Sequence, residues 1–507
     1  MDDTIKAAGR RTPNVLMLDP ADTVAVALRP LAIGEIIEGI TLRNPVPVGH
    51  KLALTDRAEG DPIVKYGQVI GRATAPIAAG QHVHSHNCGM ADLRNAAAPA
   101  PAPIRELPAR RTFQGFLRPD GRAGTRNYIG ILASVNCSTT VCHAIAAEAE
   151  KRLLPRFPGI DGFAAIVHDQ GCGMAGSGEG FDTLVRTLKG YRDHPNFGGI
   201  LIIGLGCEVN QLTLYQPTEW TKERFATFNI QEVGGSASAV RRALEILEPI
   251  AAAADRDRRT ELPVAKLTLA MQCGGSDAFS GISANPALGV ASDILVAAGG
   301  TSILSETPEI FGAEHLLIAR SNAETGGRIA AMIDWWRDYA AKNGAELDNN
   351  PSPGNKRGGL TTILEKSLGA VAKGGRAPVA GAFAYAERID RPGFVYMDSP
   401  GYDPVSATGQ VASGGNVIAF TTGRGSCFGA KPTPSLKLAS TTALFNAMPE
   451  DMDIDCGRVL SGEADLETLG LSIYETILDV ASGRKSRSEE FGYGDHEFVP
   501  WKIGATL

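Results

Sequence analysis

Apolar runs that alternate with amphipathic stretches are the strongest constraint on the fold of this chain. Five runs have the composition of buried strands, at residues 128–135, 162–168, 198–205, 265–272 and 416–422. Amphipathic stretches with a helical period follow some of them, as at 139–154 and 238–254. Alternating strands and helices form a parallel sheet with helices on its faces. We therefore predict an α/β region with parallel, Rossmann-like sheets.

A compositional break divides the chain near its front. Residues 96–103 read AAAPAPAP, a stretch that cannot hold a regular helix or strand and suits a semi-rigid polyproline spacer. Before it, β-rich pieces such as TVAVAL and GHKLAL alternate with turn residues, which is typical of a compact, mainly β unit. We predict a tail (1–18), a small β domain (19–94), a Pro/Ala linker (95–111) and two α/β domains (112–260 and 261–507).

Composition favours a small molecule as the partner. The net charge is −7, and no basic run with interleaved aromatic residues is present, so we expect no nucleic-acid binding. No stretch approaches the roughly 18 uninterrupted apolar residues that a membrane span needs, and the first residues lack a signal-peptide core. We expect a cytoplasmic protein without a membrane partner, and a homodimer as the commonest kind of assembly.

Cysteines follow all five of the apolar runs. Eight cysteines in 507 residues do not form a disulfide scaffold, so in a reducing compartment we expect thiols, metal ligands or nucleophiles. Ligands bind outside the carboxyl ends of parallel strands. Five loops should therefore crowd one sheet edge, and they carry Cys137, Cys172, Cys207, Cys273 and Cys427. The first three lie at equal intervals of 35 residues, about the length of one βα unit.

Flexible and polar residues accompany these cysteines. Glycines let the backbone approach a ligand or turn with positive φ, and polar groups are supplied by Asn136, His168, Glu208 and Asp277. The pattern predicts a site for a metal and a polar substrate. The alternative for each single cysteine is a small buried residue, and the close spacings of zinc fingers or ferredoxin-type clusters are missing. Cys142 and His143 are expected inside the following helix, as packing residues.

Three other segments carry candidate ligands. If 81–87 is extended, His82, His84 and His86 share one face, where they either bind a metal or face solvent. Arg424 and Lys431 lie in the loop GRGSCFGAKPTPS, which suits a carboxylate-bearing substrate or is a surface loop with two solvated charges. Lys356 precedes a predicted helix in NPSPGNKRGGLTT, a segment that a plain interdomain loop would also resemble. No nucleotide-binding fingerprint is convincing.

These segments together resemble the altronate and galactarate dehydratase family of sugar-acid hydro-lyases. GHKLAL, KYGQVIG and GQHVHSHN are similar to its N-terminal SAF (β-clip) domain. Its catalytic region is matched by DGRAGTRNYIGI, HDQGCG, GLGCE, QCGGSDAFSGISANPALG, NPSPGNK and FTTGRG. The histidine segment is closer to the altronate branch, whereas GQVASGGNVIAFTTGRG is as close to the galactarate branch. The related sulfolactate sulfo-lyases usually divide the two parts between separate chains.

The resemblance implies a hydro-lyase, activated by Fe²⁺ or Mn²⁺, that converts an aldonate or aldarate to a 2-keto-3-deoxy acid. D-altronate is the expected substrate; galactarate, another such acid and sulfolactate are the alternatives. The metal would hold the carboxylate and 2-hydroxyl, while a base takes the C2 proton and an acid protonates the leaving 3-hydroxyl. A sugar-acid binding protein without catalysis is the alternative of a different class.

Position after strands guides our assignment of roles within this chemistry. As metal ligands we assign His84, His86, Cys137, Cys172, Cys207, Glu208 and Cys273, with Asp277 as a further candidate. As catalytic residues we assign His168, Lys356 and Asp277, and as substrate-binding residues Asn136, Ser276, Arg424 and Lys431. Thiolates also suit an iron–sulfur cluster, in which a cluster iron would hold the leaving hydroxyl, so a single ion and a cluster both stay open.

Overall fold

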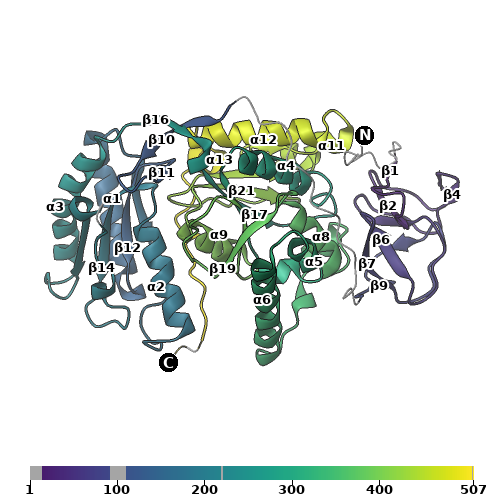
Figure 1. Ribbon diagram of the computed structural model, residues 1–507, viewed down its shortest axis with the longest axis horizontal. Helices are drawn as coiled ribbons and strands as arrows, with labels where there is room; N and C mark the ends of the chain where they lie inside the picture. Colours follow the sequence, from purple (N-terminus) through teal and green to yellow (C-terminus); the bar gives the residue numbers. More distant parts are fainter. Residues whose placement is uncertain (1–13, 92–109, 219–220, 505, 507) are drawn as a thin grey trace.

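A computed structural model describes residues 14–91, 110–218, 221–504 and 506. Three domains lie in a row (Figure 1): a four-stranded α/β domain on the left, a seven-stranded α/β domain in the centre and the front β domain on the right. The predicted α/β class with a small β domain is confirmed. The predicted Pro/Ala linker lies outside the described residues up to residue 109, as does most of the predicted tail.

Short antiparallel strands build the front domain. One sheet has the order β1 (Val15–Leu16), β2 (Val24–Ala27), β5 (Lys51–Ala53) and β8 (His82–Val83). A second contains β6 (Pro62–Lys65), β7 (Gln68–Ala73) and β9 (Cys88–Gly89), and β3 (Ile36–Ile37) pairs with β4 (Ile40–Thr41). The prediction of an extended segment over 81–87 is wrong beyond Val83. The chain turns there because the amides of Asn87 and Cys88 both donate to the carbonyl of His84.

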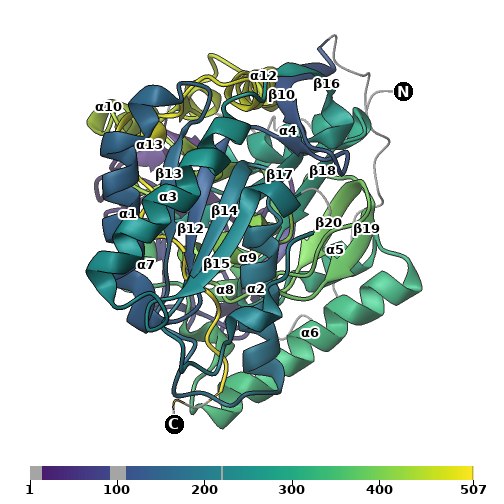
Figure 2. The same ribbon diagram turned by 90° about the vertical axis from the view of Figure 1, so that its left-hand side faces the viewer.

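The four-stranded domain has parallel strands in the order β13 (Gly162–Ile166), β12 (Tyr128–Ala133), β14 (Phe197–Gly204) and β15 (Phe225–Asn229). Its helices are α1 (Thr139–Arg152), α2 (Glu179–Arg192) and α3 (Ser236–Ala254). Figure 2 looks onto this domain, with α1 and α3 in front of the sheet. Cys142 and His143 lie inside α1, as predicted, and Cys142 is buried.

A small sheet joins the two α/β domains. Its strands are β10 (Thr112–Leu117), β11 (Ala123–Gly124) and β16 (Thr260–Pro263), all paired antiparallel. β10 precedes the four-stranded domain and β16 follows it, so both covalent connections to that domain pass through one sheet.

The seven-stranded domain has a fully parallel sheet. Its order is β19 (Val379–Phe383), β20 (Gly393–Met397), β18 (Thr301–Leu304), β17 (Thr268–Gly274), β21 (Val417–Thr422), β22 (Ser435–Ala439) and β23 (Ile454–Asp455). Its strands are apolar on both faces: Leu269 and Met271 of β17 pack into one hydrophobic cluster and Ala270 into another. This pattern is typical of parallel sheets that are covered on both sides.

Helices cover both faces of the seven-stranded sheet. They are α4 (Ala284–Ala297), α5 (Glu314–Ile318), α6 (Ala323–Lys342), α7 (Pro353–Arg357), α8 (Ile363–Ala372), α9 (Asp403–Ala412), α10 (Thr442–Ala447), α11 (Arg458–Ser461), α12 (Leu466–Ala481) and α13 (Arg487–Glu490). α4 packs against α12, whereas α9 packs against α2 of the four-stranded domain. None of the helices in the described residues is long and apolar enough to cross a membrane.

The division into two sheets corrects the prediction that five cysteine loops crowd one edge. Cys137, Cys172 and Cys207 follow β12, β13 and β14 of the four-stranded sheet, whereas Cys273 lies in β17 and Cys427 follows β21 of the seven-stranded sheet. Apolar periodicity identifies buried strands, but it carries no information about which strands share a sheet.

The front domain docks on the seven-stranded domain through buried charges. Lys51 Nζ lies 2.9 Å from Glu365 Oε2, and Lys65 Nζ lies 2.8 Å from Glu365 Oε1. All three side chains are fully buried, and Lys51 also donates to the carbonyl of Gly359. Around them, apolar residues of the front domain such as Ile63 and Ile70 share one hydrophobic cluster with the seven-stranded domain.

Candidate active site

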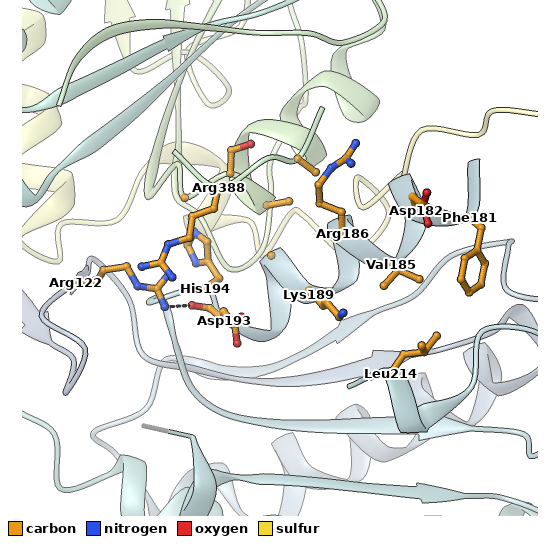
Figure 3. Close-up of a pocket in the computed structure, with 15 residues that line it drawn as sticks. Arg122, Phe181, Asp182, Val185, Arg186, Lys189, Asp193, His194, Leu214 and Arg388 are labelled. Atoms are coloured by element: carbon orange, nitrogen blue, oxygen red, sulfur yellow. Dashed lines mark hydrogen bonds between the residues drawn. The ribbon is translucent and has the colours of Figure 1, made fainter. Parts of the chain in front are cut away.

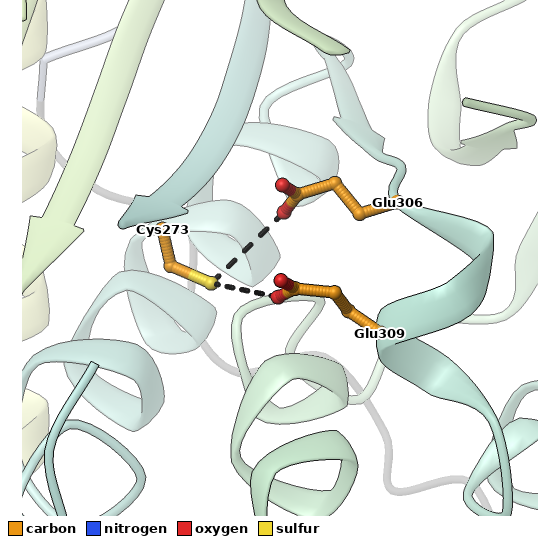
Figure 4. Close-up of side chains that lie close together, drawn as sticks. All are labelled: Cys273, Glu306 and Glu309. Carbon is orange, nitrogen blue, oxygen red and sulfur yellow. Dashed lines mark hydrogen bonds between the residues drawn. The ribbon is translucent and has the colours of Figure 1, made fainter. Parts of the chain in front are cut away.

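A buried acidic cluster lies at the carboxyl ends of the two central strands β17 and β18. Cys273 belongs to the end of β17, and Glu306 and Glu309 lie in the turn that follows β18 (Figure 4). Cys273 Sγ lies 3.7 Å from a Glu309 carboxylate oxygen and 4.0 Å from one of Glu306. One donor atom from each residue lies within 4.8 Å of the other two, which is compatible with ligands of one metal ion.

Two lysines from the α8 segment balance the charge of this cluster. Lys373 Nζ lies 2.7 Å from Cys273 Sγ and 3.3 Å from Glu306, while Lys366 Nζ lies 2.6 Å from Glu309. Asn350 accepts from Lys366 at 3.0 Å and donates to Glu309 at 3.0 Å. The second oxygen of Glu306, Oε1, is buried and has no hydrogen-bond partner in the described part of the chain.

Burial shifts the proton equilibria of these groups. It raises the pKa of the Cys273 thiol to about 12, although Lys373 opposes the shift. The pKa of Glu306 is raised well above its usual range by burial and by the neighbouring charge of Glu309. Asp403, the first residue of α9, has its pKa raised to about 6 by burial and by Glu309. A carboxyl group with such a pKa can exchange protons near neutral pH.

Asp403→Asn should stabilise the protein at pH 8 by up to about 3 kcal/mol and have little effect near pH 4. The native pKa of about 6 exceeds the unfolded value of 3.8, so the folded state binds the extra proton between these values and loses stability as pH rises through them. Urea unfolding of both proteins from pH 4 to 8 measures the difference. A stability difference that does not change with pH would contradict the shifted pKa.

Three motif loops meet beside the acidic cluster. The amide of Ala278 donates to the carbonyl of Gly358, and the Asn355 side chain donates to the carbonyl of Ser276 at 2.7 Å. The amide of Gly423 donates to the carbonyl of Gly275. A narrow cavity of about 10 Å³, with room for about one water, lies between the motif loops and the acidic cluster. The residues that line it include Cys273, Ser276, Asp277 and Lys366.

Four histidines of the front domain gather on the other side of these loops. His50 Nδ1 lies 2.9 Å from His82 Nε2, His84 Nε2 lies 2.9 Å from the carbonyl oxygen of Lys356, and the His82 and His86 ring centroids are 5.3 Å apart. Burial lowers the pKa of His82 to about 3 and that of His84 to about 4, so both rings are neutral at pH 7. Among the described residues they do not form a three-ligand group around one point.

The predicted site residues in the seven-stranded domain lie close together, but they differ in whether their polar groups are free to contact a ligand. Asp277 is buried, and its Oδ1 accepts from the amides of Phe279 and Ser280 and from the hydroxyls of Ser280 and Ser440. It therefore shapes the loop. Ser276 is buried, whereas Lys356 is half-buried and Arg424 is exposed. Within the described residues, the charged groups of Lys356 and Arg424 have no hydrogen-bond partner, which leaves both available to a carboxylate.

Arg424→Ala should raise KM for the substrate roughly tenfold, because a charge-assisted hydrogen bond is worth about 1.5–3 kcal/mol. Lys431→Ala is the matched comparison. Lys431 already pairs with Asp495 at 2.7 Å, so its removal should change KM less than about twofold. Steady-state kinetics of both variants test the assignment, and an equal change in KM would contradict it.

The other predicted residues lie in the four-stranded domain, at the opposite end of the molecule from the histidines (Figure 1). His168 is buried, and backbone groups occupy both of its ring nitrogens: the carbonyl of Ala133 at 3.0 Å and the amide of Gln170 at 3.1 Å. Burial lowers its pKa to about 4. Its ring is thus held between backbone groups, without a free nitrogen for proton transfer.

The Glu208 carboxylate is also engaged by neighbouring protein groups. It accepts from the Ser134 hydroxyl at 2.7 Å and from the amides of Leu205 and Gly206. Asn136, Cys137, Cys172 and Cys207 are exposed on this edge. His84 and His86 therefore do not join Cys172 and Cys207 around one metal, because the seven-stranded domain lies between them (Figure 1).

A separate cavity of about 430 Å³ opens along α2 (Figure 3). Basic residues such as Arg122, Arg186, Lys189 and Arg388 line it. It also touches His194 and Gly414, which precede β14 and β21, so part of it adjoins the amino ends of these strands. Since ligands of parallel sheets bind at the carboxyl ends, we place the substrate at the motif loops instead.

Sequence reasoning missed most of the buried cluster. Glu306 and Glu309 follow β18, a four-residue strand too short to stand out as an apolar run. Lys366 and Asp403 lie on helices and Lys373 directly follows one, and charged residues at such positions are usually solvated. The same positional rule that selected Cys273 would have found Glu306 if the strand TSIL had been recognised.

Comparison with known proteins places the chain among its relatives. Family models match the SAF domain of altronate/galactarate dehydratases (residues 13–91), the second domain of D-galactarate dehydratase/altronate hydrolase (115–255) and the C-terminal domain of D-galactarate/altronate dehydratase (264–506). The chain is 34% identical to altronate dehydratase of Bacillus subtilis and 36% identical to that of Escherichia coli. Each alignment covers 96% of this chain and 98% of the relative.

Galactarate dehydratase (L-threo-forming) of Escherichia coli is 36% identical over 90% of both chains. The beta subunit of (2R)-sulfolactate sulfo-lyase from Chromohalobacter salexigens is a more distant relative, 32% identical over 77% of this chain, and its alpha subunit matches 46 residues. The three family models and the full-length matches agree with the resemblance seen in the motifs. The chain belongs to the altronate/galactarate dehydratase family.

Proposed function

We propose that this protein is a hydro-lyase that removes water from D-altronate to leave a 2-keto-3-deoxy acid. The observation that carries the proposal is the meeting of three motif loops with the buried cluster of Cys273, Glu306 and Glu309. The altronate dehydratases that match over 96% of the chain support this substrate. The proposed site lies at the carboxyl edge of the seven-stranded sheet.

The reaction requires two proton transfers. A base takes the proton from C2, the C3–O bond breaks, and the departing hydroxyl leaves as water after protonation; the resulting enol becomes the 2-keto acid. Asp403 can accept a proton near neutral pH, since its pKa is raised to about 6. Lys366 and Lys373 hold protons beside the carboxylates, and Arg424 and Lys356 hold the substrate carboxylate.

A divalent ion, Fe²⁺ in preference to Mn²⁺, is part of the proposal. Cys273, Glu306 and Glu309 fit it in spacing, and the unpartnered Glu306 Oε1 is a free acceptor. A soft thiolate beside carboxylates favours iron over the harder manganese. When bound there, the ion would act as a Lewis acid toward the substrate carboxylate and 2-hydroxyl.

Metal binding at these residues should release a proton and tighten as pH rises from 6 to 8. The reason is that a thiolate is required, whereas burial raises the pKa of the Cys273 thiol to about 12. Calorimetry with Mn²⁺ in buffers of different ionisation enthalpy counts the protons released. Cys273→Ser is the control variant, and unchanged proton release in it would contradict the assignment.

Galactarate is the second candidate substrate, because the galactarate dehydratase relative is equally identical over 90% of the chain. An anaerobic assay with added Fe²⁺ distinguishes the two. Altronate, galactarate, other aldonates and aldarates, and sulfolactate are offered in turn, and 2-keto-3-deoxy acids or sulfite are measured. Product from altronate alone is expected. Product from galactarate alone would show that galactarate, and not altronate, is the substrate. No product from folded, iron-loaded protein would refute the hydro-lyase proposal.

The proposal includes a homodimer in the cytoplasm. Light scattering of the purified chain measures the assembly, and a mass of twice 53.3 kDa is expected. Fractionation of cells that express the tagged chain tests the compartment.

A further inference from the structure

Three exposed cysteines lie in the loops that follow three neighbouring strands of the four-stranded domain. Cys137 follows β12, Cys172 follows β13 and Cys207 follows β14, and the sheet order places β12 between the other two. Adjacent strands are only about 4.8 Å apart. The three thiols therefore belong to loops that start side by side at one edge, and all three are exposed.

Hydrogen bonds tie these three loops together next to each cysteine. The amide of Asn136, beside Cys137, donates to the carbonyl of Gln170 at 2.9 Å. The carbonyl of Gly171, beside Cys172, accepts from the amides of Val209 and Asn210 at 3.0 and 3.1 Å. Ser134 donates to Glu208, beside Cys207, at 2.7 Å. Each loop is thus fixed to at least one of the others within a few residues of its cysteine.

Glycines allow the backbone to pack this closely. Gly171 has φ +99°, Gly173 has φ +62° and Gly206 has φ +129°, a region that other residues rarely adopt. A β-carbon at Gly171 would also collide with the carbonyl oxygen of Ser134. Glycines flank Cys172 on both sides and precede Cys207. Because glycine has no side chain, these two cysteine-bearing loops can pack closely against their neighbours.

The surroundings of the thiols suit a group with negative charge. α1 begins at Thr139, two residues after Cys137, and the amino end of a helix favours anions. Within the described part of the chain, the amides of Cys172, Gly173 and Cys207 have no hydrogen-bond partner. The Glu208 carboxylate is already engaged, because it accepts from Ser134 of the loop after β12 and from the amides of Leu205 and Gly206 in its own loop.

We propose that Cys137, Cys172 and Cys207 bind an iron–sulfur cluster through three thiolates. Among the described residues, the three-ligand group compact enough for one ion is that of Cys273, and these cysteines do not form one. Thiolates of a cluster lie farther apart, because each binds a different iron. Cysteine thiolates are the usual ligands of such clusters, and a fourth iron without a thiolate would be open to an oxygen ligand.

This cluster site is independent of the proposed hydro-lyase site, since it uses another domain and none of the residues around Cys273. The full chain is purified without oxygen and reconstituted with Fe²⁺ and sulfide. Iron, acid-labile sulfide and absorbance near 400 nm are then measured. About four iron and four sulfide per chain are expected for a cubane cluster, beyond any iron at the Cys273 site.

Variants identify the ligands. Cys137→Ser, Cys172→Ser and Cys207→Ser should each lose most of the sulfide and absorbance, and the triple variant should lose all of both. Cys427→Ser is the matched control, because Cys427 is also exposed but follows β21 of the other sheet, and it should keep the wild-type content. Circular dichroism checks folding, which serine at exposed positions should preserve.

Three results would overturn the proposal. They are a wild-type chain without labile sulfide after reconstitution, stoichiometric zinc in place of iron and sulfide, or a loss of sulfide and absorbance in Cys427→Ser as large as in the other three variants. Turnover of the sugar acids is measured in the same samples. A cluster without turnover would refute the hydro-lyase proposal alone, whereas turnover without labile sulfide would refute the cluster alone.

Discussion

Glu365→Gln is expected to destabilise the protein by about 3–5 kcal/mol, because it leaves the buried Lys51 and Lys65 without their anion. Burial raises the pKa of Glu365, but the two ammonium groups outweigh this effect and hold the pKa well below its usual range. The carboxylate is therefore charged throughout the physiological range. Urea unfolding at pH 7 measures the loss.

Glu35→Gln provides the matched control for this experiment. Glu35 pairs with Arg29 at 2.7 Å, a distance similar to those of the buried pairs, but both side chains are partly exposed, at 30% and 44%. Its loss should destabilise the protein far less than the loss of Glu365, because solvent screens an exposed ion pair. If the two variants unfolded at the same urea concentration, the buried ion pairs would not hold the front domain in place.

Lys373→Met should lower kcat/KM for the accepted sugar acid at least about 100-fold. Its ammonium group lies 2.7 Å from Cys273 Sγ and 3.3 Å from Glu306, and it opposes the raised pKa of both. Without it, the pKa of Glu306 rises further and the charge balance of the cluster is lost. Initial rates across pH 5.5–8.5 test this, because the pH dependence of kcat/KM should change in shape and kcat/KM should also fall.

Lys342→Met, at the exposed end of α6, is the control and should leave the rates unchanged. Lys373→Met is also expected to lose stability, so its folded fraction is measured by circular dichroism before each assay. A folded Lys373→Met protein with wild-type turnover would exclude the buried cluster from the reaction.

The order of elements could be predicted from sequence because parallel strands are buried on both faces. The runs at 128–135 and 416–422 became β12 and β21, and the stretch at 139–154 became α1. The division of these strands between two sheets could not be predicted. Pairing depends on contacts between residues far apart in the chain, such as those of β17 with β21, which apolar periodicity does not report.

The candidate site was predictable only where a loop directly follows an obvious strand. Cys273 was found in this way, whereas Lys366 and Lys373 on or next to α8 were not. A polar residue after a strand also has two possible uses. Asp277 and Glu208 satisfy backbone amides of their own loops, and sequence alone does not distinguish such a residue from one that faces a ligand.

The buried contact between Lys51, Lys65 and Glu365 bears on how the chain is assembled from its parts. In the sulfolactate sulfo-lyase relatives, the matching segments belong to separate alpha and beta subunits. A covalent connection replaces a bimolecular association by an intramolecular one, at an effective concentration that reaches the millimolar range for short tethers. The front domain can therefore stay bound to the seven-stranded domain even if the affinity between the two is low. The same affinity would be too weak to hold two separate subunits together at cellular concentrations. A two-chain version would need a tighter interface to reach the same occupancy.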